Sequence, residues 1–576
     1  MVNVNKRLIK LRSLFFQNKI EGYLVGVTGE YGFVLPNEKR LKFITNFSGS
    51  NGFAIILDSK VILITDGRYL LQAKNELASI ENSTIVDMDS PISWSKLGVS
   101  KLTIGYDPKV FVYNKIKLFE KLNLKIIENN LVDQIWKNKP SLNVTECFIY
   151  NEKESIGEKL KKFVTPSKYN VDYILLLSSV SVCWLLNIRA RDLEYDPLFL
   201  SYALISEKEI CVFTHNAKSL DNIKNYLPAN LIKKDFSFLK TELENISGKI
   251  LLDKNNTPIY ILNLLGNSKN NIEIVNNQDP CLIPKSCKMT QEIIEFERIH
   301  IEDSLALCEF FAYIDDINFE KEKITEFQLS EKLRSFRMNL KSYICDSFSY
   351  IVGYNENSTI IHYRPSSEHS KIIGNKGILL IDSGAHYFGG TTDITRTITL
   401  GKPTYQEQLD YTTVLKGHIA LGSCIFPEGA SGSNLDTLAR QFLWKLSKDF
   451  PHGTGHGVGN CLTVHEGPQS INRYNNIPLK KGMILSNEPG YYKAHEYGIR
   501  IENLVYITVA EANFLKFENL TLMPYCKDLI IVNLLSSEEK SYIKKYYEKI
   551  WKKISSLLSN KARNWLKNEV EFINNV

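Results

Sequence analysis

The chain has 576 residues, too many for one hydrophobic core, and at about 150 residues per domain it predicts three or four domains. Its composition, 44% hydrophobic, 23% charged and 11% aromatic, is ordinary for a folded protein and argues against intrinsic disorder. The net charge of +6 is small for this length and gives no reason to expect a nucleic acid as partner.

We expect neither a signal peptide nor a membrane-spanning segment. Residues 1–16 mix basic with apolar side chains and lack the apolar core of about 7 to 15 residues that a signal peptide needs. The longest uncharged run, residues 173–188, is shorter than the roughly 20 apolar residues that cross a bilayer, and it predicts a buried strand followed by the start of a helix. The ten cysteines include no CxxC pair, which favours reduced thiols and a cytoplasmic location.

The first part of the chain alternates helical and strand-like segments, which is an α/β pattern. Apolar residues at helical spacing predict a helix over residues 7–18. Short apolar runs predict three buried strands, GYLVGV (22–27), GFAIILD (52–58) and KVILITD (60–66). The Lys-Asn-Lys-Pro-Ser run at 137–141 is typical of a linker, so we place the first domain at residues 1–140.

A second α/β pattern follows in a similar order. Residues 152–163 predict a charged helix, and three apolar runs predict strands, VDYILLL (171–177), SYALIS (201–206) and ISGKILLDK (246–254). The stretch NNQDPCLIPKS at 276–286 marks the next boundary, so the second domain is predicted at 141–288. The shared order of elements suggests that the two domains are related.

Residues 289–576 are predicted to form the third domain. Long amphipathic helices, such as the one expected over 291–317, alternate with strand pairs, and a helical extension begins at about residue 525. In that extension Ser536 and Glu539 have the spacing of a capping box. Five apolar residues then recur at spacings of three and four: Ile543, Tyr547, Ile550, Ile554 and Leu557. This apolar face either packs on its own domain or forms an intermolecular contact.

Five residues of this third domain combine four carboxylates with one imidazole, and eight of the ten histidines of the chain also lie between positions 362 and 495. Each of the five lies in a distinctive phrase, IDSGAHYFGGTTDITRT (381–397), HGTGHGVG (452–459), SNEPGYY (486–492) or GIRIENL (498–504). The five residues are Asp382, Asp393, His456, Glu488 and Glu502.

A hairpin is expected to bring the first two carboxylates together. Asp382 ends the apolar strand GILLI, and Asp393 follows the Gly389-Gly390 turn. Two acidic groups that converge at the core end of strands are costly unless a cation neutralises them. A lone aspartate at a strand end is usually a turn residue, but two across a glycine turn favour a cation site.

The remaining three residues have apolar or glycine-rich surroundings. His456 lies among glycines, which allow close approach of the backbone to an ion or substrate. Glu488 follows the apolar segment KGMILSN, and Glu502 lies between Ile501 and Leu504 in a strand-like segment. A glutamate in such a segment needs a partner, and an ion pair between Arg500 and one of these glutamates is the structural alternative to metal binding.

Four carboxylates with one imidazole suit hard or borderline divalent ions. The set favours a pair of manganese, cobalt or zinc ions over a zinc site built from thiolates. Two such ions about 3.5 to 4 Å apart share a bridging hydroxide, lower its pKa and polarise a carbonyl. Hydrolysis of an amide or ester is therefore expected.

These phrases resemble those of the pita-bread metallopeptidases, in particular the long, three-domain aminopeptidase P (Xaa-Pro aminopeptidase) group. IIHYRP around His362, HGTGHGVG with VHEGP, and SNEPGYY with GIRIEN are similar to the proline-specific branch. FSGSNGFAII, TDGRYLLQA, NLVDQIWKNKP and WLLNIRARDLEYDPLFLSYALI extend the likeness into the first two domains, and NLTLMPYCKDLIIV extends it to the tail. The resemblance implies two related creatinase-like α/β domains, then a pita-bread catalytic domain with a helical tail, an α/β (α+β) fold overall.

The resemblance also implies roles for individual residues. Asp382, Asp393, His456, Glu488 and Glu502 would hold two divalent ions, most often manganese, with cobalt and zinc as alternatives. Catalysis would involve His362, His452, His465 and Glu488, with the general base left open. Substrate contacts would come from His362, His456, His465 and Arg500, and from Arg68 of the DGRY phrase, which would reach the site of a partner subunit in a homodimer. An ion pair of Arg68 with Asp66 is the alternative.

The implied reaction is attack of a metal-bridging hydroxide on the first carbonyl of a peptide whose second residue is proline. A prolidase, which cleaves Xaa-Pro dipeptides, is the closest competitor, but it has one N-terminal domain where this chain is predicted to have two. A non-catalytic binding module on the same fold is a third possibility, and the presence of all five ligands argues against it.

Overall fold

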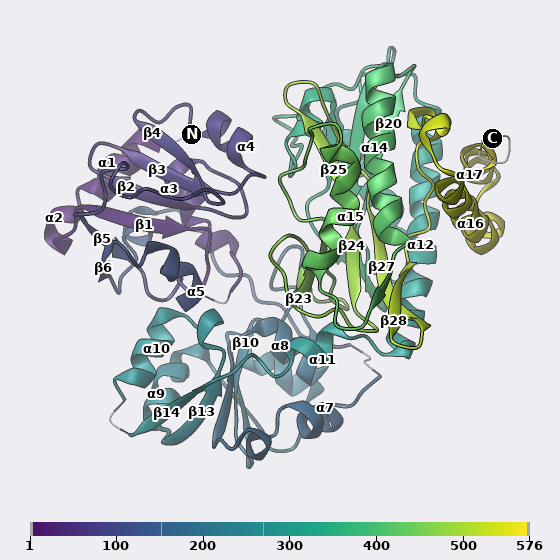
Figure 1. Ribbon diagram of the computed structural model, residues 1–576. Helices are drawn as coiled ribbons and strands as arrows, with labels where there is room; N and C mark the ends of the chain where they lie inside the picture. Colours follow the sequence, from purple (N-terminus) through teal and green to yellow (C-terminus); the bar gives the residue numbers. More distant parts are fainter. Residues whose placement is uncertain (1–3, 31, 151–152, 269, 573–576) are drawn as a thin grey trace. The chain divides into compact units, whose positions relative to one another are not determined.

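The computed structural model describes residues 4–30, 32–150, 153–268 and 270–572. These residues form two compact units, and each unit is described by itself. The first comprises Met1–Leu193 and Leu198–Cys281, and the second comprises Glu194–Pro197 and Leu282–Val576. Figure 1 shows mixed helices and strands in both units. Among the described residues, no helix has the length and apolar character that crossing a membrane requires.

The first unit contains two six-stranded sheets of the same topology. One has the order β4-β3-β2-β1-β5-β6 and the other the order β12-β11-β10-β8-β13-β14. In each sheet a central strand, β1 or β8, pairs antiparallel on one side and parallel on the other, and the outer pairs are parallel. This repeat confirms the expectation of two related α/β folds. The strands of the first sheet are β1 Gly22–Gly26, β2 Phe53–Leu57, β3 Val61–Thr65, β4 Ser83–Asp87, β5 Thr103–Tyr106 and β6 Asn123–Ile126. Those of the second are β8 Tyr173–Leu176, β10 Ser201–Ile205, β11 Ile210–Thr214, β12 Leu231–Lys234, β13 Gly248–Leu252 and β14 Ile272–Asn276.

Two helix predictions in this unit need correction. The helix expected over 7–18 is two helices, α1 (Val4–Arg12) and α2 (Phe15–Asn18). The helix expected over 152–163 is α7 (Ile156–Phe163); its first turn is set by Ser155, which accepts from the backbone N–H of Glu158 while Glu158 caps Ser155 in return. Residue 152 lies outside the described part of the chain. The uncharged run 173–188 forms β8 and the fully buried helix α8 (Ser179–Leu186), as predicted.

The second unit is built from antiparallel strand pairs flanked by helices. One three-stranded sheet has the order β16-β17-β20, another the order β15-β18-β19, and a six-stranded sheet has the order β21-β28-β27-β24-β22-β23. The helices α14 and α15 lie side by side (Figure 1). The strands are β15 Tyr343–Asp346, β16 Ile351–Tyr354, β17 Gly377–Ser383, β18 Ala385–Tyr387, β19 Gly390–Thr391, β20 Ile394–Leu400, β21 Ile425–Pro427, β22 Gly455–Gly457, β23 Glu466–Ile471, β24 Ile484–Asn487, β25 Gly490–Lys493, β26 Tyr497–Arg500, β27 Asn503–Glu511 and β28 Phe514–Asn519. The main helices are α12 Thr290–Asp315, α13 Glu326–Met338, α14 Tyr405–Gly422 and α15 Gly432–Trp444.

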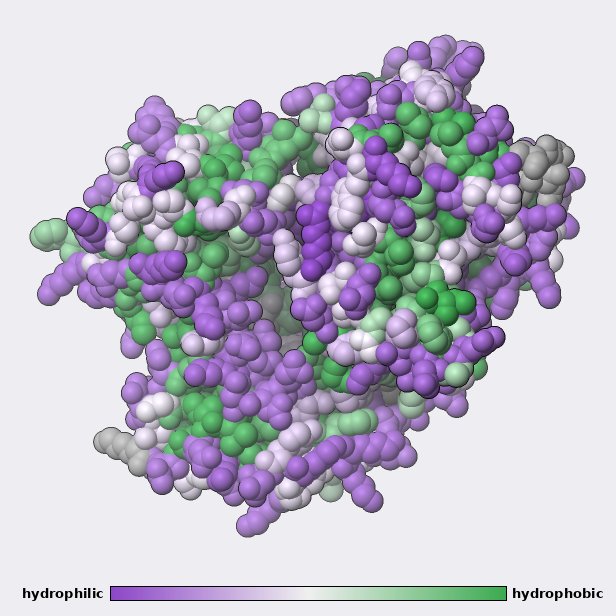
Figure 2. Space-filling view, in the orientation of Figure 1, coloured by the Kyte–Doolittle hydropathy of each residue, from purple (hydrophilic) through white to green (hydrophobic). Residues whose placement is uncertain are grey.

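The C-terminal helices pack on the core of this same unit. In α16 (Ser537–Ile554) the apolar side chains predicted to share one face are buried in the large core that also contains residues of α12, β17 and β20. Helix α17 (Asn560–Glu571) lies along α12 (Figure 1), and Trp565 stacks on Phe311. In the view of Figure 2, the outer surface of this region is largely hydrophilic. The apolar face therefore serves its own unit rather than an intermolecular contact. Leu557 was wrongly included in it, because α16 ends at Ile554 and Leu557 is 58% exposed.

Candidate metal centre

Strand pairing in the second unit brings the predicted ligands together. Strand β17 pairs antiparallel with β20, with Asp382 opposite Thr395. Asp393 directly precedes β20, so the predicted approach of the two aspartates follows from this pairing. The turn between them passes through Gly389 and Gly390, whose φ angles of +125° and +156° suit glycine and few other residues. The hairpin itself is interrupted by the short strands β18 and β19.

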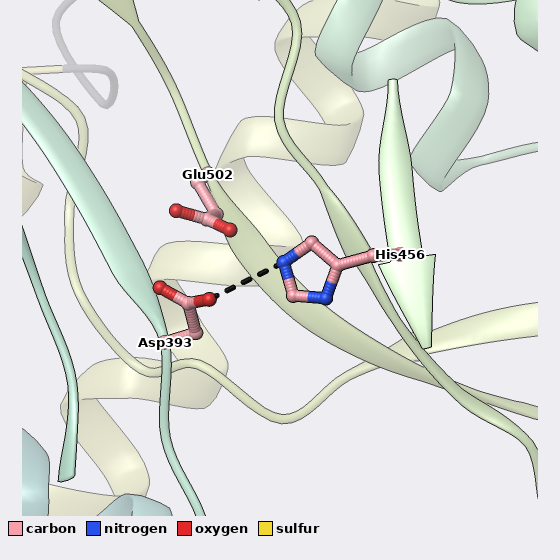
Figure 3. A group of neighbouring side chains, drawn as sticks. All are labelled: Asp393, His456 and Glu502. Atoms are coloured by element: carbon pink, nitrogen blue, oxygen red, sulfur yellow. Dashed lines mark ion pairs between the residues drawn. The ribbon is translucent and has the colours of Figure 1, made fainter. Parts of the chain in front are cut away.

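Three of the five side chains converge on one point (Figure 3). Asp393, His456 and Glu502 each offer a ligand atom, and these atoms lie within 4.8 Å of one another. Nε2 of His456 is 3.4 Å from Oδ2 of Asp393 and 3.5 Å from Oε1 of Glu488. In the six-stranded sheet β27, β24 and β22 are neighbours, so the last three of the five predicted ligands lie in or directly beside adjacent strands: His456 lies in β22, Glu488 follows β24 and Glu502 precedes β27.

Local hydrogen bonds orient His456 and Glu488. Nδ1 of His456 lies 2.9 Å from the carbonyl oxygen of Gly457 and donates to it, which leaves Nε2 as the acceptor atom that faces the carboxylates. Ser486 donates to Oε1 of Glu488 at 3.0 Å, and its hydroxyl also accepts from the backbone N–H of His456. Ser486 therefore ties the imidazole segment to the glutamate segment.

The ion pair expected for Arg500 involves an aspartate, not a glutamate. Nη2 of Arg500 lies 2.6 Å from Oδ2 of Asp382. Nε of Arg500 donates to Oγ1 of Thr395, and this hydroxyl donates to Oε2 of Glu502 at 2.8 Å. The alternative of a glutamate partner for Arg500 is therefore not what the structure shows, because the packing of β26 against β17 and β20 brings Asp382 beside Arg500. Arg500 also donates to Oη of Tyr492.

The site is a buried accumulation of negative groups. Burial raises the pKa of Asp393 well above its usual range, and the negative charges of Asp382 and Glu488 raise it further. Burial, then Asp393 and Glu488, raise the pKa of Glu502 well above its usual range. Burial also raises the pKa of Glu488, against the opposing effects of His456 and Arg500. Converging carboxylates of this kind are stabilised in their ionised form by a bound cation.

The arrangement fits divalent metal ions on grounds of donor chemistry. Oδ1 of Asp382 is buried and has no hydrogen-bond partner among the described residues, although its other oxygen is paired with Arg500. A buried oxygen of this kind is costly unless it has a ligand. Hard oxygen donors with one imidazole are the mixture that such ions take.

The three histidines expected near the site occupy different settings. The ring of His465 lies 4.1 Å from that of His456, edge to face, and the side chain of His465 is exposed. Nε2 of His452 lies 2.9 Å from Oη of Tyr492, so it is linked through Tyr492 to Arg500. His362 follows the 3-10 helix η7 (Asn355–Thr359) and is half-buried. The structure brings His452 and His465 beside the ligand cluster.

In the first unit, Arg68 makes the ion pair that was the alternative to substrate binding. Nε of Arg68 donates to Oδ1 of Asp66 at 2.8 Å, and Nη2 donates to Oδ2 at 2.9 Å. A bidentate pair of this kind fixes the guanidinium. The cross-subunit role of Arg68 stays a prediction.

Several residues that orient the ligands were not foreseen, among them Thr395, Ser486 and Tyr492. Each stands inside a quoted phrase, TTDITRT or SNEPGYY, so the signal was its position beside a ligand. Hydroxyl residues next to candidate carboxylate ligands are plausible hydrogen-bond donors to them.

Comparison with family models covers most of the chain in four consecutive segments. Residues 7–134 and 138–292 each match the creatinase/prolidase N-terminal domain. Residues 296–509 match metallopeptidase family M24, and residues 513–573 match the C-terminal region of peptidase M24. The last two segments contain the ligand cluster and the helices α16 and α17.

Relatives of known description align over nearly the whole chain. The putative Xaa-Pro aminopeptidase FRA1 of Saccharomyces cerevisiae is 35% identical over 99% of this chain and 86% of its own length. Xaa-Pro aminopeptidase 1 of Dictyostelium discoideum is 34% identical over 99% of this chain and 97% of its own. The crystal structure of X-prolyl aminopeptidase from Caenorhabditis elegans, described as a cytosolic enzyme with a di-nuclear active site, is 30% identical and superposes with a TM-score of 0.91, covering 99% of this chain and 100% of that one. The chain therefore belongs to the Xaa-Pro aminopeptidases of metallopeptidase family M24, and it is a hydrolase.

Proposed function

We propose that the protein is a metal-dependent aminopeptidase that releases the first residue from peptides with proline at the second position. The convergence of Asp393, His456 and Glu502, with Glu488 and Asp382 beside them, carries this proposal. The relatives support this proposal over nearly the whole chain, since Xaa-Pro aminopeptidases align with 99% of it.

We propose two divalent ions as cofactors, with manganese as the native metal and cobalt or zinc as alternatives. Support comes from the four carboxylates and one imidazole of the set, and from the di-nuclear site of the C. elegans relative. Bound ions would polarise the scissile carbonyl and lower the pKa of the attacking water. Asp382, Asp393, His456, Glu488 and Glu502 would hold them.

The protein's own groups would manage the protons and the peptide. Ser486 donates to Oε1 of Glu488 and so orients the carboxylate that would both help to hold the ions and accept a proton from the attacking water. The proton that Glu488 accepts would then pass to the leaving nitrogen. His362 and His465 would bind the peptide, and His452, held by Tyr492, would assist the proton transfer. Arg500 would act mainly by holding Asp382 and Thr395 in place.

Selectivity for proline follows from the chemistry of its amide. An Xaa-Pro bond is a tertiary amide without an N–H, so the site need not supply an acceptor at that point. A pocket without that acceptor would meet the proline ring with apolar or aromatic surfaces.

The protein is expected to act on peptides in the cytosol as a homodimer. The C. elegans relative is described as cytosolic.

The function is tested by assaying the metal-free chain on Arg-Pro-Pro and Gly-Pro, with and without added Mn²⁺. We expect Mn²⁺-dependent release of arginine from Arg-Pro-Pro. Cleavage of Gly-Pro alone would identify a prolidase instead, and no cleavage of either peptide would refute the enzymatic function.

Asp393→Asn serves as the control for the metal site. It should lower turnover by more than about 100-fold, because even residues that only orient a ligand contribute 10- to 100-fold. An unchanged circular dichroism spectrum would show that the fold is retained. Near wild-type turnover would contradict the assignment of Asp393 as a ligand.

A further inference from the structure

One arginine outside the ligand set links the metal centre to the C-terminal extension. Arg396 lies in β20, three positions after Asp393, and its side chain is almost completely buried. Its Nη1 donates to the carbonyl oxygen of Glu502 at 2.6 Å and to that of Thr395 at 2.9 Å. One edge of the guanidinium therefore holds the backbone of Glu502 and of Thr395. Thr395 is also the residue whose hydroxyl donates to the Glu502 carboxylate.

The other N–H groups of Arg396 reach the C-terminal segment. Nε donates to the carbonyl oxygen of Pro524 at 2.9 Å, and Nη2 donates to that of Met523 at 2.7 Å. Nη2 also lies 2.8 Å from Oδ1 of Asn503 and 3.4 Å from Oη of Tyr546. Arg396 thus hydrogen-bonds both to the segment after β28 and to helix α16, and it connects them to the strand ends that carry the predicted ligands.

The role of this guanidinium is geometric. In the described part of the chain Arg396 makes no ion pair, and every acceptor named above is a neutral oxygen. A buried cation without a carboxylate partner is costly unless its donors are satisfied. The planar guanidinium, with five N–H donors, contacts acceptors from four segments at once, which a lysine ammonium cannot do.

The hydroxyl of Tyr546 in α16 completes the link. It accepts from Nδ2 of Asn503 at 3.2 Å and from the backbone N–H of Met523 at 3.3 Å. Its single proton lies within reach of two carbonyl oxygens, those of Thr521 (2.9 Å) and Met523 (3.0 Å). Asn503 directly follows Glu502, so the hydroxyl holds the ligand segment and the C-terminal segment against each other.

We propose that Arg396 and Tyr546 are positioning residues of the metal centre, through which the C-terminal extension sets the place of Glu502. The inference rests on the proposed function, because it assigns a role toward the metal ions of that site. It makes α16 part of the catalytic apparatus without any contact of α16 with substrate.

The test compares Tyr546→Phe with Tyr547→Phe in the full-length chain. Tyr547 is the matched control: it is the next residue in the same helix, is equally buried, and its hydroxyl contacts only the backbone of Tyr525 among the hydrogen bonds described. Mn²⁺ binding to the chelator-treated protein is measured by calorimetry, kcat and KM are measured on Arg-Pro-Pro, and the unfolding midpoint of the metal-free chain reports general stability.

Tyr546→Phe should weaken Mn²⁺ binding by about tenfold, the low end of the range for residues that orient ligands, and lower kcat with KM unchanged. Tyr547→Phe should bind Mn²⁺ within about twofold of wild type. It should shift the unfolding midpoint of the metal-free chain in the same direction as Tyr546→Phe, because each variant loses a buried, hydrogen-bonded hydroxyl. Arg396→Lys, which keeps the charge, should weaken binding at least as much as Tyr546→Phe.

Equal Mn²⁺ affinities in the two tyrosine variants would overturn the proposal. If Arg396→Lys does not fold, the tyrosine pair still decides. A wild-type chain that binds no Mn²⁺ would instead refute the proposed function, and the inference with it.

Discussion

Buried charge is the feature of individual residues that explains both the site and its surroundings. Asp393 and Glu502 lie where an ionised carboxylate is unfavourable, and their neighbours raise their pKa further. Arg396 and Arg500, both nearly fully buried, hold the segments that carry these carboxylates. Buried polar groups are retained at a cost to stability only where their hydrogen bonds are complete or a ligand completes them. The two arginines have complete hydrogen bonds. The predicted metal-binding residues would be completed by a bound cation.

A buried histidine should make the second unit sensitive to acid. Burial lowers the pKa of His300 in α12 to about 4, and its Nδ1 lies 2.7 Å from the carbonyl oxygen of Phe296. As the pH falls below 6.5, His300 becomes protonated in the unfolded chain, whereas in the folded chain it stays neutral until about pH 4. The free energy of unfolding should therefore fall as the pH falls through this window, by on the order of 3 kcal/mol in total from this residue.

Denaturant unfolding at pH 7, 6, 5 and 4 checks this expectation. His300→Gln should reduce the loss of stability on acidification, whereas His369→Gln, at an exposed position, should leave it unchanged. An equal loss in wild type and His300→Gln would exclude His300 as the source.

At the level of helices and strands, apolar spacing predicted type and place well where one strong signal dominated. The strands GFAIILD and KVILITD became β2 and β3, and the helix expected over 291–317 became α12. The predicted boundaries were wrong where a capping residue sets the helix start. Ser155 caps α7, so this helix begins at Ile156, four residues after the expected position. The fate of the α16 face could not be predicted, because apolar spacing is the same for a helix that packs on its own core and one that packs on another chain.

Packing of α16 leads to a contrast between two apolar residues of the tail. Ile550 is completely buried in the main core, and Leu557 is largely exposed. Ile550→Ala should lower the free energy of unfolding by about 2–5 kcal/mol, whereas Leu557→Ala should change it by no more than about 0.5 kcal/mol. Chemical denaturation measures both. Similar small effects would mean that α16 does not pack on the core.

At the level of the whole molecule, two sheets of identical topology precede the catalytic unit. Their likeness was expected from the order of elements, and the two segments match two family models that are both described as the creatinase/prolidase N-terminal domain. The domain limits near 140 and 288 stay predictions. So does the homodimer, for which the tail gives no support because its apolar face is already covered.

The dimer and the role of Arg68 are tested together. Sedimentation velocity should give a mass of twice the 66.0 kDa of one chain. Arg68→Ala should raise KM for Arg-Pro-Pro by at least about tenfold, as expected for loss of a hydrogen bond from a charged group, without weakening Mn²⁺ binding. Lys10→Ala, which removes a charge from the exposed side of α1, should change neither constant. A monomer would remove the cross-subunit role, and an unchanged KM in Arg68→Ala would leave Arg68 only its ion pair with Asp66.

The sequence by itself predicted the five metal ligands and gave the reaction class and the two related α/β folds. This was possible because a ligand is recognised by its chemical type and by the phrase around it, and both are local. Only the tertiary structure decided which groups hold the ligands. Asp382 with Arg500, and Arg396 with Glu502, Pro524 and Tyr546, are separated by more than 100 residues in the chain. Their contacts depend on strand register and helix docking, which arise from the packing of the whole unit and leave no local signal.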